Sequence, residues 1–159
     1  MSSILETLRV DWPDEAACAA SAARLARRPG LTAATIELQG PLGAGKTTFV
    51  RHLLHALGVA GRVKSPTYAL MESYDIEHDG VLLPIRHFDF YRFDDPQEWE
   101  DAGFREVFAA PGLKLVEWPD KAAGLLPQAD LALHIEPLGD DRRRVRFDAL
   151  TARGAGLIA

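Results

Sequence analysis

The feature that most constrains how this chain folds is a glycine-rich segment, Gly40–Thr47, with the sequence GPLGAGKT. It matches the pattern G-x4-G-K-[ST] in full, and it lies between a predicted strand, Thr35–Leu38, and a predicted helix, Lys46–Leu57. Glycines permit backbone torsions that other residues avoid, so the main-chain amides of such a loop can approach the oxygens of a phosphate group. The segment therefore predicts a strand–loop–helix unit of an α/β fold that binds phosphates at the start of its helix.

The polar side chains at the end of this segment extend the prediction to a nucleoside triphosphate with magnesium. Lys46 offers a mobile positive charge for the β- and γ-phosphates, and the Thr47 hydroxyl is a suitable ligand for Mg²⁺. The residues predicted to hold the nucleotide in this loop are Gly40, Leu42, Gly43, Ala44, Gly45, Lys46, Thr47 and Thr48. The sequence contains no asparagine, so it lacks the Asn-Lys-x-Asp motif by which small GTPases recognise guanine, and ATP is the predicted nucleotide.

Two acidic residues at predicted strand ends are candidates for organising the metal and the attacking water, which a phosphate loop needs for hydrolysis. In the segment His87–Arg92, strand alternation places His87, Asp89 and Tyr91 on one face and two phenylalanines on the other. Glu117 follows a short apolar strand, an arrangement similar to the Walker B motif with Glu in place of Asp. For both carboxylates, an exposed position at the end of a strand is the alternative interpretation.

The remaining patterns fit one domain over residues 1–150, followed by a flexible tail over residues 151–159. The further elements that they predict are helices over Asp14–Arg28 and Pro96–Phe108 and strands over Tyr68–Ile76, Val81–Phe93, Lys114–Val116, Leu131–Ile135 and Arg144–Phe147. The run Arg142–Arg144 is interpreted as a solvated turn beside the last strand, and not as the arginine-rich lid of a nucleoside-monophosphate kinase.

Composition and charge narrow the kinds of partner. The 159-residue chain has a formal net charge of -5, whereas a strong electrostatic grip on a nucleic-acid backbone needs a basic surface, so no direct DNA binding is expected. The single cysteine, Cys18, falls in an alanine-rich helical segment and is predicted to be a small core residue. The sequence shows neither a signal-peptide pattern nor a run of about 18 apolar residues, so we expect a cytoplasmic protein without a membrane-spanning helix.

In combination, these segments resemble the TsaE family (also called YjeE), small bacterial ATPases of tRNA threonylcarbamoyladenosine modification. The matching segments are Leu38–Thr48 (LQGPLGAGKTT), Leu57–Gly58, Lys64–Tyr68 (KSPTY), Tyr74, His87–Arg92 (HFDFYR) and Val116–Pro119 (VEWP). They occur in the order and spacing of the family, and the resemblance extends over roughly residues 14–148. This chain departs from the family pattern at Pro41, where Asp is usual, and at Tyr68, where Phe is commoner.

The resemblance implies a single P-loop NTPase-like α/β domain, with a largely parallel central sheet, antiparallel additions and flanking helices. It implies that Lys46 and the loop amides hold the phosphates, and that Thr47 and Glu117 serve the magnesium ion. It also makes Asp89 a candidate for positioning water or metal. Thr67 becomes a candidate sensor of the γ-phosphate, and Trp118 is expected beside the nucleotide.

The resemblance further implies partners. Family members act with the proteins TsaB and TsaD, and TsaD transfers the threonylcarbamoyl group to adenosine 37 of tRNA. ATP hydrolysis would reset that complex between turnovers, and contact with tRNA would be indirect, through the complex. Two alternatives stay open from the residues alone: a small-molecule kinase, in which an acceptor hydroxyl replaces water, and a nucleotide-gated binding module with negligible turnover.

Overall fold

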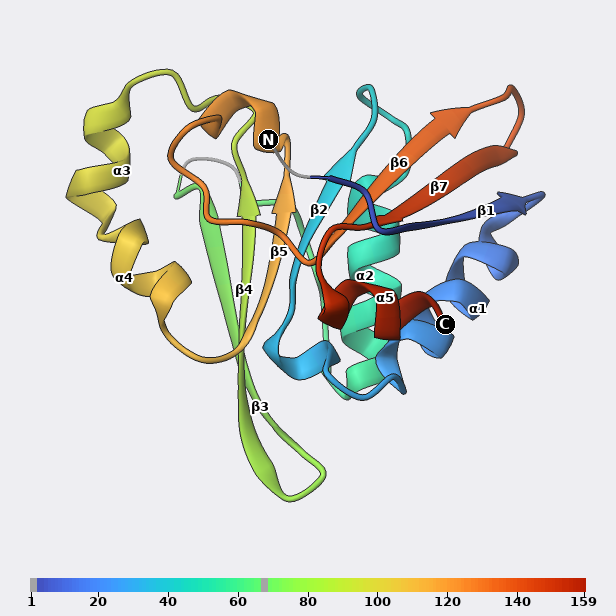
Figure 1. Ribbon diagram of the computed structural model, residues 1–159, viewed down its shortest axis with the longest axis horizontal. Helices are drawn as coiled ribbons and strands as arrows, with labels where there is room; N and C mark the ends of the chain where they lie inside the picture. Colours follow the sequence, from blue (N-terminus) through green and yellow to red (C-terminus); the bar gives the residue numbers. More distant parts are fainter. Residues whose placement is uncertain (1–2, 67–68) are drawn as a thin grey trace.

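The computed structural model describes residues 3–66 and 69–159, and these residues form a single mixed sheet with helices on both of its faces (Figure 1). The strands are β1 (Glu6–Trp12), β2 (Thr35–Gln39), β3 (Met71–His78), β4 (Val81–Asp89), β5 (Leu113–Glu117), β6 (Leu131–Pro137) and β7 (Arg143–Ala149). The helices are α1 (Glu15–Ala26), α2 (Lys46–Leu57), α3 (Pro96–Ala102), α4 (Phe104–Ala109) and α5 (Ala152–Ile158), with short 3-10 turns η1 (Leu31–Ala33) and η2 (Pro119–Ala122). No helix within these two ranges has both the length and the apolar character needed to cross a membrane.

The sheet is parallel at its centre and antiparallel at its edges. Across the described residues its strand order is β1-β7-β6-β2-β5-β4-β3. β2 pairs in parallel with both β5 and β6, and β4 continues the parallel block beside β5. β7, β1 and β3 are added in antiparallel pairs. This arrangement confirms the predicted fold class, and it sets the carboxyl end of β2 between two parallel neighbours, at the edge where ligands of α/β sheets usually bind.

The core on one face of the sheet is built by α1 and α2. Helix α2 begins and ends at the predicted residues and buries the apolar stripe Phe49, Val50, Leu53, Leu54 and Leu57. Trp12, at the end of β1, stacks on Phe49 with the ring centroids 5.6 Å apart. Gly58 ends the helix with a φ of 111°, a left-handed conformation that glycine adopts readily. This packing fixes the direction of α2 and hence the position of the loop before it.

An aromatic core covers the opposite face of β4 and β5, where α3 and α4 lie away from α1 and α2 (Figure 1). Phe88 of β4 contacts Phe104 and Phe108 at centroid distances of 5.2 and 4.4 Å. The single helix predicted over residues 96–108 is instead broken at Gly103, whose φ of 68° lets the chain turn between α3 and α4. The predicted alternation along β4 is confirmed, because Phe88 packs among these rings while His87 contacts Glu117 on the side of α2.

The N-terminal strand β1 is missing from the sequence prediction. Its charged residues, among them Glu6 and Asp11, obscure an alternation in which Leu8, Val10 and Trp12 turn toward the core. In the described part of the chain β1 pairs with β7 alone, at the edge of the sheet. β1 forms because it pairs with β7, which lies far away in the sequence, and the local sequence of β1 therefore gives little indication of a strand.

The predicted flexible tail over residues 151–159 is wrong, because Ala152–Ile158 form helix α5 against β7. The Thr151 hydroxyl caps this helix: it accepts a hydrogen bond from the Gly154 amide at 3.1 Å and donates one to Asp130 Oδ1 at 2.7 Å. The helix also buries a leucine in the core shared by α1 and α2. Its packing relies on Gly154, which approaches the backbone of Asp130 closely, and a glycine adds nothing to an apolar periodicity in the sequence.

This packing predicts different responses at the two glycines of α5. A Cβ atom at Gly154 would lie 1.8 Å from the backbone oxygen of Asp130, whereas a Cβ atom at Gly156 would meet nothing within 4 Å. Gly154→Ala should therefore lower the free energy of unfolding by about 1–3 kcal/mol, and Gly156→Ala should leave it unchanged or raise it by up to about 1 kcal/mol. Urea denaturation measures both variants; equal stabilities would show that this helix does not dock as described.

Candidate functional site at the phosphate loop

The loop from Gly40 to Gly45 connects the carboxyl end of β2 to the first residue of α2. The backbone requires glycine at both of these positions. A Cβ atom at Gly40 would lie 2.6 Å from the carbonyl oxygen of Ile135 in β6, and Gly45 precedes α2 with a φ of 104°. The first amides of a helix have no hydrogen-bond partners within the helix. The amides of the loop and of the start of α2 are therefore available as donors to an anion, and the positive end of the α2 dipole adds to its attraction.

Lys46 is buried beside this loop, with 5% of its surface exposed. Its ammonium group donates to the carbonyl oxygens of Gly40 and Pro41, the latter at 3.1 Å. The same group lies 3.9 Å from the centroid of the Trp118 ring, within reach of a cation–π interaction. Burial lowers the pKa of the ammonium group, and the negative charges of nearby carboxylates oppose that shift. The amine is therefore held at the loop by two carbonyl groups and an aromatic face.

Glu117, at the end of β5, accepts hydrogen bonds from α2 and from β4. The Thr47 hydroxyl lies 3.0 Å from each carboxylate oxygen and 2.7 Å from the Ser65 hydroxyl. Because Thr47 has one hydroxyl hydrogen, it donates to the carboxylate and accepts from Ser65. His87 Nε2 lies 2.6 Å from Glu117 Oε2, and the two side chains are 0% and 3% exposed. The alternative interpretation of Glu117 as an exposed strand end is therefore excluded.

Asp89 lies at the carboxyl end of β4, directly beside Glu117 in the register of the parallel strands β4 and β5. Its Oδ1 accepts a hydrogen bond from the Tyr91 amide at 3.0 Å. Burial raises the pKa of the Asp89 carboxyl group, and the hydrogen bond from Tyr91 opposes this shift. Since the carboxyl ends of parallel strands meet at one edge of the sheet, both predicted acids lie at the edge that carries the phosphate loop.

These side chains line one cavity of about 270 Å³ at the amino end of α2. Its lining residues are Leu42, Gly43, Ala44, Gly45, Lys46, Thr47, Thr48, Ser65, Asp89, Glu117, Trp118 and Arg143. The structure thus brings together the residues predicted for the phosphates, the metal and the attacking water, and Gly40 begins the loop that forms the cavity wall. Thr67, the remaining predicted site residue, lies outside the described residues.

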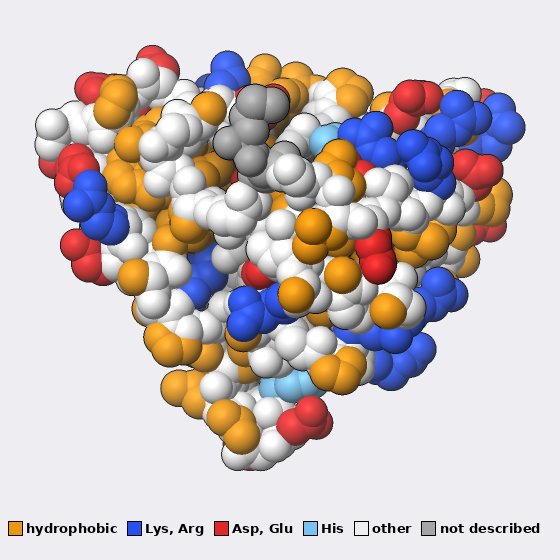
Figure 2. Space-filling view, in the orientation of Figure 1, with side chains coloured by type: hydrophobic (Ala, Val, Ile, Leu, Met, Phe, Trp, Pro, Cys, Tyr) orange, Lys and Arg blue, Asp and Glu red, His pale blue; other side chains and the backbone are white. Residues whose placement is uncertain are grey.

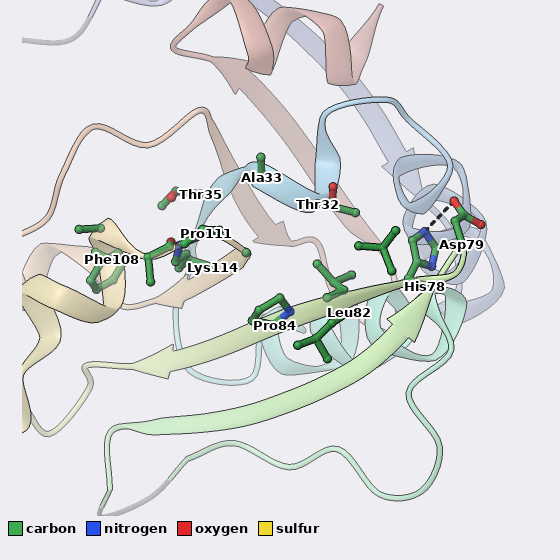
Figure 3. Close-up of a pocket in the computed structure, with 15 residues that line it drawn as sticks. Thr32, Ala33, Thr35, His78, Asp79, Leu82, Pro84, Phe108, Pro111 and Lys114 are labelled. Atoms are coloured by element: carbon green, nitrogen blue, oxygen red, sulfur yellow. Dashed lines mark hydrogen bonds and ion pairs between the residues drawn. The ribbon is translucent and has the colours of Figure 1, made fainter.

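A larger cavity, of about 620 Å³, lies at the amino ends of the parallel strands, between β4, η1 and the segment before β5 (Figure 3). Leu82, Pro84 and Phe108 contribute apolar surface to its wall, and the ion pair of His78 with Asp79 lies at one end. The glycine-rich loop and both predicted acids lie at the opposite edge of the sheet. We therefore assign the candidate site to the smaller cavity.

Arg143 belongs to this site, although its sequence context indicates a solvated turn over Arg142–Arg144. Arg143 begins β7, and its Nε donates to the carbonyl oxygen of Ala44 in the phosphate loop at 2.7 Å. Basic side chains gather over this end of β6 and β7 (Figure 2), and the neighbours of Arg143 in the run are exposed, as expected. The signal that identifies Arg143 is its alternation with the buried Val145 and Phe147 of the same strand.

A second cavity, of about 150 Å³, adjoins the first and shares with it Ala44, Gly45, Thr48 and Arg143. The other residues that line it are Trp12, Asp14, Glu15, Cys18 and Asp141. Burial raises the pKa of the Cys18 thiol to about 12, and the side chain belongs to the α1–α2 core, which confirms its predicted place. Because the two cavities share four residues, they extend the site from the phosphate loop toward α1.

A glycine-rich loop between a central parallel strand and a helix, with a buried acid at the end of the neighbouring strand, defines this chain as a P-loop NTPase-like protein of the α/β class. The sequence profile of a family described as "Threonylcarbamoyl adenosine biosynthesis protein TsaE" matches residues 12–145. The chain belongs to the TsaE family.

Individual relatives support this assignment. The chain is 44% identical to the tRNA threonylcarbamoyladenosine biosynthesis protein TsaE of Haemophilus influenzae over an alignment of 124 residues. This alignment covers 78% of this chain and 75% of that protein. The chain is 39% identical over 141 residues to the protein of the same name from Bacillus subtilis, covering 89% and 84%. The crystal structure of YdiB from Bacillus subtilis matches with a TM-score of 0.77 and 31% identity, covering 99% of this chain and 95% of that one. The family resemblance carried by the motifs is confirmed.

Proposed function

We propose that this chain binds ATP with Mg²⁺ and hydrolyses it, and that it does so in the cytoplasm, with TsaB and TsaD, as a component of tRNA threonylcarbamoyladenosine modification. The place in that pathway is supported by membership of the TsaE family and by the names of its relatives. The ATPase activity is supported by one observation above all: Lys46, Thr47, Asp89 and Glu117 line the same cavity at the amino end of α2.

In this proposal the triphosphate lies along the glycine-rich loop, where main-chain amides and the start of α2 provide its hydrogen-bond donors. Lys46 supplies positive charge at the β- and γ-phosphates. Arg143 adds a second cation, because its Nε is fixed on the Ala44 carbonyl and its side chain lines the same cavity. The nucleoside extends past Thr48 into the adjoining cavity beside α1.

The oxygen atoms around Thr47 suit a magnesium ion. Thr47, Ser65 and Glu117 present two hydroxyls and a carboxylate in one hydrogen-bonded group, and Mg²⁺ prefers oxygen ligands. We assign Thr47 as a direct ligand and Glu117 as the acid that holds the ion through water. A magnesium ion bound there supplies charge neutralisation at the β- and γ-phosphates.

Asp89 orients or deprotonates the attacking water in this proposal. It lies beside Glu117 on the next strand and lines the same cavity. Burial raises the pKa of its carboxyl group above the ordinary value of an aspartate, which favours a role in proton transfer. Because the carboxylate must be ionised to accept a proton, hydrolysis that depends on Asp89 is lost as the pH falls through this raised pKa.

The segment that carries Ser65 links the site to the rest of the complex. The Ser65 hydroxyl contacts the Thr47 hydroxyl at 2.7 Å, so in this proposal a ligand of Thr47 also affects the position of Ser65. Thr67, two positions further along, is the proposed sensor of the γ-phosphate. Switch segments of this kind are ordered by contacts to the γ-phosphate and magnesium, which couples the nucleotide to a protein surface. We propose that TsaB and TsaD bind to that surface.

Loss of Arg143 should weaken ATP binding. A charge-assisted contact to phosphate contributes about 1.5–3 kcal/mol, so Arg143→Ala and Lys46→Ala should each reduce affinity by about ten- to more than a hundredfold. Arg142→Ala is the matched control, because Arg142 is exposed at the same turn and its loss should cost less than about fivefold. Isothermal titration calorimetry with Mg–ATP measures all three variants. Unchanged affinity in Arg143→Ala would remove Arg143 from the site.

Substitution of either carboxylate, Glu117 or Asp89, should slow ATP hydrolysis. Glu117→Gln is expected to bind ATP but hydrolyse it slowly, because the amide keeps the shape and removes the charge that organises the metal and its waters. Asp89→Asn should slow turnover by about 10²–10⁴-fold if Asp89 accepts the proton, and less if it only orients water. Steady-state phosphate release at saturating Mg–ATP tests both variants, with circular dichroism as the control for folding. Near-wild-type turnover in both would exclude these residues from the mechanism.

Phosphate release without an added acceptor tests the function as a whole. The chain alone should hydrolyse ATP slowly, and the TsaB–TsaD complex should accelerate it. A catalytic element supplied in trans would give about 10³–10⁵-fold, and reordering of a local segment would give less. Rapid hydrolysis that ignores the complex would contradict the proposed partnership. ADP formation that requires an acceptor hydroxyl, with the phosphoryl group transferred to that acceptor and no free phosphate released, would favour a kinase. Stimulation that survives Thr67→Ala would exclude Thr67 as the sensor.

A further inference from the structure

His87 is a wholly buried histidine whose one polar contact in the described structure is with Glu117. Its Nε2 lies 2.6 Å from Glu117 Oε2, and its side chain is 0% exposed. Among the described residues, the other ring nitrogen, Nδ1, is buried without a hydrogen-bond partner. His87 lies two residues before Asp89 in the sequence, but it has no part in the phosphate binding, metal binding or water positioning proposed above.

The direction of this hydrogen bond follows from the chemistry of the two groups. A carboxylate only accepts hydrogen bonds, so a hydrogen lies on Nε2, and Nδ1 is the ring nitrogen without a partner among the described residues. The Thr47 hydroxyl donates to the same carboxylate from the opposite element, α2. The Glu117 carboxylate is therefore held by a donor from α2 on one side and a donor from β4 on the other, and these two donors fix its orientation.

The surroundings of His87 do not explain a histidine on grounds of packing. The neighbouring positions on the same face, Ile85 on β4 and Leu115 on β5, belong to the apolar α1–α2 core. A buried nitrogen without a partner is unfavourable, and an apolar residue of similar size would avoid it. The contact that only a polar side chain can make at this position is the one to Glu117.

We propose that His87 is a positioning residue that orients the Glu117 carboxylate for Mg²⁺ binding together with Thr47. The inference rests on the proposed function of Glu117 as the acid at the metal. Residues that hydrogen-bond a metal ligand set its orientation, and their loss typically lowers metal affinity by about 10–100-fold. In this proposal the hydrogen bond from Nε2 holds the Glu117 carboxylate in its orientation. A replacement side chain with a donor at the position of Nε2 should therefore keep the affinity for Mg²⁺.

A matched pair of variants tests this mechanism. In His87→Gln the side-chain amide nitrogen falls near the position of Nε2, whereas in His87→Asn it falls near Nδ1 and cannot reach Glu117. Mg²⁺ is titrated into each protein with a non-hydrolysable ATP analogue, and analogue binding is followed by calorimetry. We expect His87→Asn to raise the Mg²⁺ midpoint by about 10–100-fold and His87→Gln to stay within about threefold of wild type. Analogue affinity measured without Mg²⁺ should be the same in all three proteins.

Several results would overturn the inference. A wild-type Mg²⁺ midpoint in His87→Asn, or equal loss in the two folded variants, would show that the Nε2 hydrogen bond does not position Glu117. In a Glu117→Gln background, His87→Asn should add little further loss; full additivity would mean that His87 acts elsewhere. If wild type itself bound the analogue without any dependence on Mg²⁺, the proposed function would fail instead.

Nuclear magnetic resonance of the ¹⁵N-labelled wild-type protein without Mg²⁺ gives a second readout that needs no variant to fold. The imidazole of His87 should carry a hydrogen on Nε2, the nitrogen that lies beside Glu117. A hydrogen on Nδ1 alone would rule out donation to Glu117, even if His87→Asn proved unable to fold.

Discussion

The site depends on the burial of one carboxylate, that of Glu117, at the point where β4, β5 and α2 meet. A buried carboxylate is unfavourable unless it is hydrogen-bonded, and Thr47 and His87 provide those bonds from the helix and from the neighbouring strand. Both contacts require the register of the parallel strands, in which Glu117 pairs with Leu38 on one side and Asp89 on the other. A shift of one residue would turn these side chains into the aromatic core on the opposite face.

Elements with strong local signals could be predicted from the sequence. α2 has an apolar stripe and a glycine, Gly58, at its end, and it begins and ends at the predicted residues. β2 likewise leads directly into the phosphate loop. β1 and α5 could not be predicted, because long-range contacts hold each of them in place. β1 depends on its pairing with β7, and α5 on the close approach of Gly154 to the backbone of Asp130.

For the candidate site, the sequence predicted which residues lie together better than it predicted the contacts among them. The loop and both acids were expected together and line one cavity, while their roles remain predictions. Strand alternation placed His87 on the face of Asp89, but its bond to Glu117 depends on the register between β4 and β5, which the sequence does not show. Arg143 was missed for a similar reason, because its contact with Ala44 depends on the order of strands in the sheet.

The pairing of β1 with β7 also bears on the order in which the molecule is assembled. Glu6 pairs with Ala149, so this contact closes almost the whole described chain into a loop, and contacts of such high sequence separation form late. During synthesis from the N-terminus, β1 is made long before β7, the strand with which it pairs. Arg143 begins that strand. A nascent chain therefore carries the glycine-rich loop well before the arginine that contacts it, and the site is complete only after β7 has been made.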